Sequence, residues 1–290
     1  MIRILFATAL LAGWFFTYPG LAQGLPPKIF LASTGADTND GSRASPKRSL
    51  QAGHDTVAAG GELVILDTAG YGAITITKSV AIVVPPGVTG FVTVTSTSGT
   101  GVNINAAFSD VVVLRGLIIE GTGPDGTGVG ISANRVGTLS VENTTIRNFQ
   151  FGIRQNPDAS SQLTMRGGAI RDTKYGVYLQ ESSSYPVQIN AIITDVEMSR
   201  NETVFRTFST NNPGYSHARL IATRCAISQS TATVFDSYGV GAQTTADGNT
   251  IMNTSRLYTA ANSATNYTRG NNTIQTNGST GDAPTPLAGR

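Results

Sequence analysis

The sequence has little charge. Asp, Glu, Lys and Arg make up 13% of its 290 residues, whereas about a quarter is typical of soluble domains. The 20 basic and 18 acidic residues nearly cancel, leaving a formal net charge of +2. A nucleic-acid-binding domain carries a clustered basic excess, so no nucleic-acid partner is predicted. Most of the exterior must therefore consist of neutral polar groups.

Cysteine, histidine and the common catalytic motifs are also scarce. Cys225 is the only cysteine, which excludes an intramolecular disulfide. The two histidines, His54 and His217, have no partner at a metal-ligand or triad spacing, so we interpret both as structural or surface residues. No phosphate-binding loop, dinucleotide fingerprint or zinc-protease motif is present. The sequence therefore predicts no catalytic residue and no cofactor.

Residues 1–22 have the pattern of a signal peptide. Arg3 supplies a positive start, residues 4–16 are mostly apolar, and small residues lead to Ala22. We expect cleavage after Ala22, which would make the mature protein secreted or periplasmic. No later stretch approaches the roughly 20 apolar residues of a membrane-spanning helix, so no membrane span is predicted.

One short pattern returns five times between Val112 and Ser228. The copies are residues 112–120, 139–147, 163–171, 191–199 and 220–228, so successive copies start 24 to 29 residues apart. A period in the twenties without a helical pattern is typical of a solenoid. One such unit cannot bury its own apolar face and must stack on its neighbours.

Alternate positions of the repeat predict which side chains face the interior, because neighbours along a strand point to opposite sides. Two columns fall on the inner side: Leu117, Thr144, Gly168, Val196 and Cys225, and two residues further on Ile119, Ile146, Ile170, Met198 and Ile227. Cys225 is therefore expected to be a buried small hydrophobe and not a reactive thiol. A second short strand follows the first in each copy, which indicates an all-β fold, a parallel β-helix.

The segment before the repeats predicts how the stack begins. A polar loop leads to a short helix from Ser49, its N-cap, to Ala58, with Gly60 and Gly61 as its stop. The motifs in this segment follow a recognisable order. It runs Gly35-x-Asp37-x-x-Asp40-Gly41-Ser42, Ser45-Pro46, the helix, Ala59-Gly-Gly61 and Asp67-x-x-Gly70-Tyr71-Gly72.

This order resembles the entry segment of exported right-handed parallel β-helix proteins of the pectin-lyase-like superfamily. The resemblance implies a single-stranded right-handed parallel β-helix whose open N-terminal end is covered by the short helix. We place this domain at residues 23–278. Residues 279–290 have no apolar periodicity and are expected to form a disordered tail. The superfamily includes polysaccharide lyases and epimerases, which implies a carbohydrate-related role.

One loop has oxygen ligands suited to calcium. Residues 37–42 read Asp-Thr-Asn-Asp-Gly-Ser, but Arg48 stands at the twelfth position, where an EF-hand needs a bidentate Glu. We interpret this loop as a solvated turn. Calcium remains the expected cofactor only if the protein is a lyase.

Charged and aromatic residues gather in the outward-facing columns. Glu120, Arg147 and Arg171 occupy equivalent positions on successive coils, and Arg154, Tyr178 and Arg206 form a further column. Such a surface could bind an acidic sugar polymer, with arginines pairing to carboxylates and Tyr178 stacking on a ring. The same arginines could equally form cross-coil ion pairs that contribute little free energy.

Two classes of function fit these observations. The outward columns are mostly Ser, Thr, Asn and Gln, which favours a non-catalytic exported protein that binds a polysaccharide or the cell envelope. The resemblance implies the alternative, a uronate polysaccharide lyase or epimerase. A lyase needs a base and clustered acids, and the sequence does not identify such a set. A polysaccharide is thus the expected partner, and the sequence does not indicate an oligomeric state.

Overall fold

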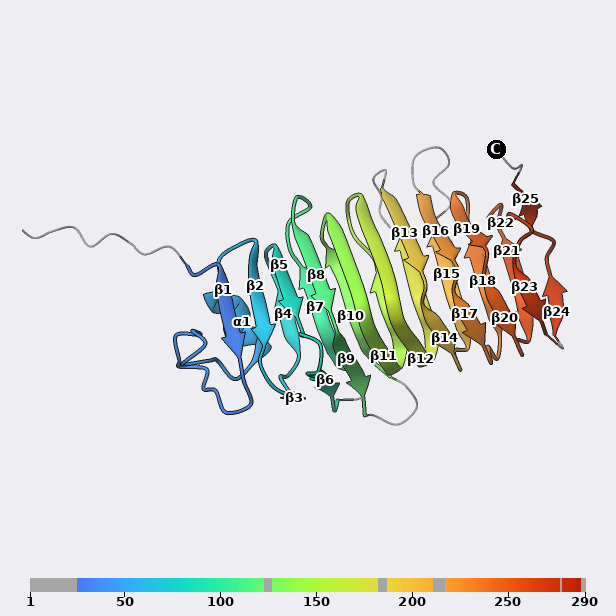
Figure 1. The fold of residues 1–290 in the computed structure, drawn as a ribbon. Coiled ribbons are helices and arrows are strands. Elements are labelled where there is room, and N and C mark those ends of the chain that lie inside the picture. The colour runs from blue at the N-terminus through green and yellow to red at the C-terminus, as the bar shows by residue number, and fades with distance from the viewer. Residues whose placement is uncertain are drawn as a thin grey trace, which may run out of the picture.

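The chain winds into a three-faced stack of parallel strands (Figure 1). The computed structural model describes residues 25–96, 98–122, 127–181, 187–210, 217–276 and 278–287. Two long strands, β11 (Thr138–Gln155) and β12 (Ser161–Glu181), pass around all three faces, which we call A, B and C in chain order.

The other strands each belong to one face, where each pairs in parallel with the strands of adjacent coils. Face A contains β1 (Lys28–Leu31), β2 (Gly61–Ile65), β5 (Val80–Val83), β8 (Val111–Arg115), β13 (Gln188–Thr194), β16 (His217–Thr223), β19 (Ala242–Asp247), β22 (Thr265–Thr268) and β25 (Thr285–Pro286). Face B contains β3 (Ala69–Gly70), β6 (Gly90–Val94), β9 (Leu117–Gly121), β14 (Glu197–Ser199), β17 (Ala226–Ser228), β20 (Thr250–Met252) and β23 (Thr273–Gln275). Face C contains β4 (Ile74–Ile76), β7 (Thr100–Asn105), β10 (Val129–Arg135), β15 (Thr203–Ser209), β18 (Thr233–Tyr238), β21 (Arg256–Ala261) and β24 (Ser279–Gly281).

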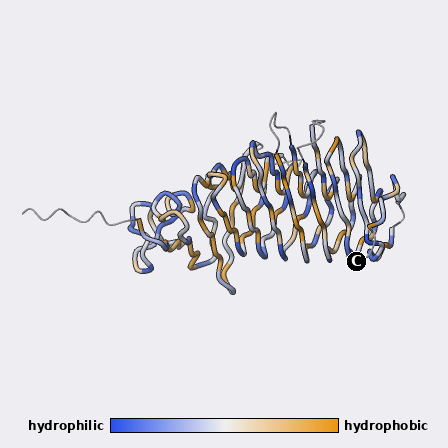
Figure 2. Tube along the Cα trace, turned by 90° about the horizontal axis from the view of Figure 1, so that it is seen from above, coloured by the Kyte–Doolittle hydropathy of each residue, from blue (hydrophilic) through white to orange (hydrophobic). Residues whose placement is uncertain are grey.

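The predicted repeat register is confirmed. The first residues of the five copies are successive partners on face A: Val112, Leu139, Leu163, Ala191 and Leu220. The isoleucine column predicted to face inward is a single ladder on face B, and each member is at most 1% exposed: Ile119, Ile146, Ile170, Met198 and Ile227. Figure 2 shows the same alternation as hydrophobic segments recurring from coil to coil.

The corners between faces are very short because single residues adopt the left-handed conformation. Asn148 (φ 62°), Asp172 (φ 55°) and Arg200 (φ 54°) turn the chain from face B to face C on successive coils. Asn and Asp tolerate this conformation because their short polar side chains bond locally. Gly168 turns another corner at φ 81°, where an added Cβ would lie 2.2 Å from the carbonyl oxygen of Thr144. Only glycine fits there.

Helix α1 (Leu50–Thr56) closes the N-terminal end of the stack. Ser49 caps it as predicted, accepting a hydrogen bond from the backbone N–H of Ala52 at 3.2 Å. The helix ends before the predicted Ala58 because Val57 is extended, with its side chain fully buried. His54 is structural, as expected: it is 2% exposed, and its Nε2 accepts a hydrogen bond from the backbone N–H of Thr77.

The C-terminal end corrects one prediction. Residues 279–287, expected to belong to a disordered tail, continue the stack as β24 and β25. Backbone hydrogen bonds order this segment: Ser279 donates to the carbonyl of Ser255 and Asp282 to that of Tyr258. An apolar pattern was absent because these strands bury little surface. Residues 288–290 and the predicted signal peptide lie outside the described residues. No helix within the described part of the chain is long and apolar enough to cross a membrane.

The interior ladder predicts a large effect of an inward charge. Ile170→Asp would place an unpaired carboxylate among buried aliphatic neighbours, and we expect a loss of unfolding free energy on the order of 3 to 5 kcal/mol. Ile192→Asp is the matched control, because Ile192 is 49% exposed, and a change within about 0.5 kcal/mol is expected there. Urea unfolding monitored by circular dichroism measures both. Equal midpoints for the two variants would show that Ile170 is not in the core.

The position of Cys225 predicts an unreactive thiol. Cys225 is 1% exposed, and burial raises the pKa of its thiol to about 11. Since only the thiolate is nucleophilic, we expect a colorimetric thiol reagent at pH 8 to label the folded protein about two orders of magnitude more slowly than the urea-unfolded chain. Rapid labelling of the folded protein would contradict the burial of this column.

Candidate functional site

The six residues predicted to form a binding surface lie on two different faces. Glu120, Arg147 and Arg171 are successive partners on face B. The second set is on face C, where Arg154 pairs with Tyr178 and Tyr178 with Arg206. The left-handed corner residues separate the two columns, so the structure does not bring the six side chains together as one surface.

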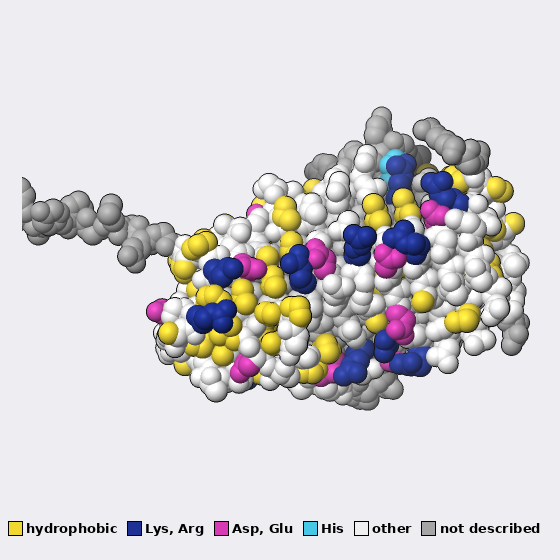
Figure 3. Space-filling view, viewed as in Figure 1, with side chains coloured by type: hydrophobic (Ala, Val, Ile, Leu, Met, Phe, Trp, Pro, Cys, Tyr) yellow, Lys and Arg dark blue, Asp and Glu magenta, His cyan; other side chains and the backbone are white. Residues whose placement is uncertain are grey.

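On face B the arginines are engaged in ion pairs between coils. The Nη2 atom of Arg147 lies 2.5 Å from a carboxylate oxygen of Glu120, and that of Arg171 lies 2.7 Å from Glu197. These pairs correspond to the structural alternative considered for this column. Figure 3 shows the same tendency on the visible face, where basic and acidic side chains mostly lie next to each other.

On face C the aromatic rings stack on one another. The ring centroid of Phe151 lies 5.2 Å from that of Tyr175 and 5.5 Å from that of Tyr178. The guanidinium of Arg206 lies over both tyrosine rings, at 5.5 and 5.7 Å. Phe151 and Arg206 belong to the coils on either side of the tyrosines, so both faces of each tyrosine ring are covered. The ring faces that the predicted stacking of Tyr178 on a sugar ring requires are therefore already in contact with Phe151 and Arg206.

Arg154 differs from most arginines of this protein. Arg206, its counterpart two coils away, is paired with Asp236 at 3.1 Å. No carboxylate of the described residues lies within ion-pair distance of Arg154. Its buried Nε has no hydrogen-bond partner among them, as is also true of the Nε atoms of Arg171 and Arg206, so the missing ion pair is what sets Arg154 apart. Its guanidinium carbon lies 5.5 Å from the Phe151 ring centroid. The ring therefore supports the guanidinium without neutralising its charge.

Arg154 lines the end of a polar groove on face C with a cavity volume of about 570 Å³. The groove continues across coils toward α1 along a column of register partners: Thr75, Asn103, Ser132 and Arg154. Asn134 donates a hydrogen bond to Asn103 at 3.1 Å and accepts one from Ser132 at 3.2 Å. We call these residues the face C groove; Tyr178 and Arg206 continue the same column of register partners beyond Arg154 but do not line the cavity. Asn103, Ser132 and Asn134 were not among the residues predicted from the sequence, although the alternation of Val102-Asn-Ile-Asn105 indicates outward amides.

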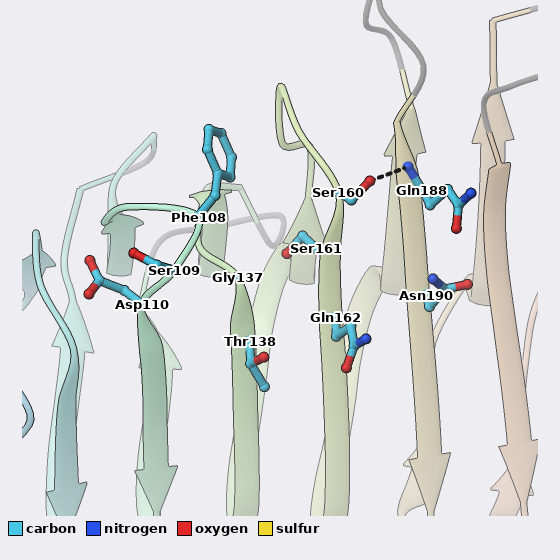
Figure 4. A pocket seen from close by; sticks show the side chains of 10 residues that line it. All are labelled: Phe108, Ser109, Asp110, Gly137, Thr138, Ser160, Ser161, Gln162, Gln188 and Asn190. Carbon is cyan, nitrogen blue, oxygen red and sulfur yellow. Dashed lines mark hydrogen bonds between the residues drawn. The ribbon is translucent and has the colours of Figure 1, made fainter.

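A second cavity, of about 270 Å³, lies at the edge of face A (Figure 4). Thr138, Gln162 and Asn190 lie side by side on neighbouring strands in this view. The only carboxylate of the cavity, that of Asp110, already accepts hydrogen bonds from the Ser79 hydroxyl and the Ala107 N–H. The free groups of this cavity are therefore neutral hydroxyls and amides.

The loop considered for calcium contains an internal cation. The ammonium of Lys47, which is 6% exposed, donates hydrogen bonds to the carbonyls of Asp37 and Asn39 at 2.9 and 2.6 Å. The Asp37 carboxylate accepts hydrogen bonds from the backbone and hydroxyl of Ser49. These oxygens therefore stabilise the start of α1. No group of three or more metal-ligating side chains occurs in the described ranges.

Comparisons with known proteins identify the fold. The sequence matches no protein-family model and no curated protein. Among solved structures, the crystal structure of pectate lyase Pel9A superposes with a TM-score of 0.51 over 89% of this chain and 79% of its own, at 12% identity. A rhamnogalacturonan lyase covers 83% of this chain and 75% of its own, with a TM-score of 0.40 and 11% identity. The protein is thus a right-handed parallel β-helix with the pectin-lyase-like fold.

The ion pairs of face B predict a small effect on stability. Arg147 and Arg171 have side chains 45% and 39% exposed, and exposed pairs contribute about 0 to 1 kcal/mol each. We therefore expect Arg147→Ala with Arg171→Ala to lower the unfolding free energy by less than about 2 kcal/mol, with a smaller difference from the parent at high salt. Urea titrations at low and high sodium chloride test this. A larger loss that persists at high salt would show that these arginines act through packing.

Proposed function

We propose that this protein is exported and binds an acidic polysaccharide along face C, with Arg154 pairing to a sugar carboxylate. The observation that carries the proposal is the uncompensated guanidinium of Arg154 at the end of a polar groove. In a chain with so few charges, a half-buried arginine without a counter-ion is costly unless a ligand supplies one. The guanidinium fork binds a carboxylate through two parallel hydrogen bonds.

The rest of the groove suits the hydroxyls of a sugar chain. Asn103, Ser132 and Asn134 offer amides and a hydroxyl on two adjacent coils beside Arg154. Adjacent coils are about 4.8 Å apart, which is close to the length of one pyranose unit. A chain lying along the stack would therefore meet a new polar side chain with nearly every sugar, and it would reach the tyrosine hydroxyls and Arg206 beyond Arg154.

The chemistry of the residues near Arg154 favours binding of the polysaccharide without catalysis. One solved structure of similar fold is that of a pectate lyase, which supports an acidic polymer as the ligand class. A lyase removes a proton with a base. Burial raises the pKa of Tyr178, so this hydroxyl stays protonated at neutral pH. The alternative, a uronate lyase or epimerase, is decided by the assay below.

The test compares Arg154, which has no ion-pair partner among the described residues, with Arg147, which has one. Arg154→Ala should weaken binding of the mature protein to polygalacturonate at least about tenfold, or roughly 1.4 kcal/mol, because it removes an unpaired binding cation. Arg147→Ala is the control, since it removes an arginine that is already ion-paired, and a change below about twofold is expected. Isothermal titration calorimetry measures both. Binding by the parent should also weaken as salt rises.

The same samples are monitored at the ultraviolet absorbance of unsaturated uronides, with and without calcium. Equal affinities for the parent and Arg154→Ala would disprove the role of Arg154. Calcium-dependent formation of unsaturated ends by the parent would replace the binding proposal with the lyase alternative.

A further inference from the structure

Face A presents a row of polar side chains that have no partner in the protein. Gln162, Asn190, Arg219 and Gln243 are successive outward partners on β12, β13, β16 and β19. No hydrogen bond or ion pair involves their side chains within the described residues. We call these four residues the amide row. Their amide and guanidinium groups are therefore free to bond to a ligand.

An apolar row lies directly beside the amide row. Two residues beyond the amide row on β13, β16 and β19, Ile192, Ile221 and Thr245 are outward register partners, and Tyr267 on β22 continues their column. Ile192 is 49% exposed and Ile221 40% exposed. A cavity of about 520 Å³ is lined by members of both rows, with Leu287 at its C-terminal end. A contiguous exposed apolar patch with a polar border is typical of a binding surface.

Another outward column of face A, which contains Arg115 and Glu142, shows that other polar side chains on this face do have partners. In this column the Nε of Arg115 lies 2.7 Å from a carboxylate oxygen of Glu142. At the corner that follows β16, the Nε of Arg224 lies 2.8 Å from a carboxylate oxygen of Asp195. Arg219, in contrast, lies between two amides with no carboxylate within ion-pair distance in the part of the chain that the structure describes. The positive charge of the row is thus uncompensated.

We infer that face A is a second polysaccharide-binding surface, separate from the face C groove. A pyranose ring has an apolar C–H face and a rim of hydroxyls, which matches an apolar row beside an amide row. Arg219 adds a position for the carboxylate of an acidic sugar. The inference rests on the proposed function for the class of ligand, because both surfaces would take a uronate polymer.

Two surfaces on one rigid stack have a consequence that one surface lacks. Faces A and C are different sides of the same stack, formed by separate strands or, in β11 and β12, by separate parts of one strand, so a single molecule can hold two polymer chains at once. The protein is therefore a cross-linker of polysaccharide chains. It needs no second copy of itself for this role, because both contacts are made by the same chain.

The test counts binding sites with a short oligogalacturonate, too short to reach both faces. Calorimetry of the mature parent should give two sites per chain. Arg219→Ala with Gln243→Ala should leave one site, and Arg154→Ala should leave the other. Both variants change half-buried or exposed side chains and should fold normally, which circular dichroism checks. With long polygalacturonate, the parent should raise light scattering because it cross-links the polymer chains. The increase in scattering should be at least about tenfold smaller for each variant, although each variant still binds.

Each outcome separates the two surfaces. One site that only Arg154→Ala removes would overturn the face A surface and leave the proposed function standing. One site that only the face A variant removes would uphold face A and refute the face C groove. No binding at all would refute both. A parent that is dimeric by light scattering and becomes monomeric in Ile221→Asp would also overturn the inference, because face A would then be an interface between copies.

Discussion

The structure depends on the parallel pairing of each coil with the next. A single coil is too small to enclose an apolar core, so its inward side chains are buried only by the ladders that they form with adjacent coils. The column through Ile119, Ile146 and Ile170 is fully buried because the register holds across strands β9, β11 and β12. A shift of one residue would turn every inward side chain outward. The outward columns are therefore as strictly ordered as the core.

This order determines what the surface can do. Because the register is fixed, outward residues of successive coils meet in rows, and their combination decides whether they satisfy one another. Arg147 meets Glu120, and the two form an ion pair. Arg154 meets Ser132 and Tyr178, neither of which carries a charge at neutral pH. Arg219 meets two amides. Most arginines of the described residues are ion-paired, and two that are not, Arg154 and Arg219, carry the binding proposals.

The sequence was sufficient to predict the stack and its register, because the positions that are apolar in every repeat are the positions that the stack buries. It was also sufficient to predict the helix start, since Ser49 has the chemistry of an N-cap. It could not show that Arg147 and Arg154 face different ways. Their separation depends on one left-handed residue, Asn148, and an asparagine in sequence does not reveal its dihedral angles. The sequence likewise could not show that the ring of Tyr178 is contacted by Phe151 and Arg206, because these contacts depend on side-chain packing.

The two ends of the stack differ, and this gives the molecule a direction. At the N-terminal end a helix with buried contacts covers the first coil, whereas the C-terminal end consists of exposed short strands, β24 and β25, one of which ends in Pro286. In a one-dimensional array each coil is stabilised by its neighbours, so opening starts where a neighbour is missing and the contacts are fewest. Among the described coils, local opening is therefore expected first at β24 and β25, and the part of each face nearest to α1 should stay closed longest.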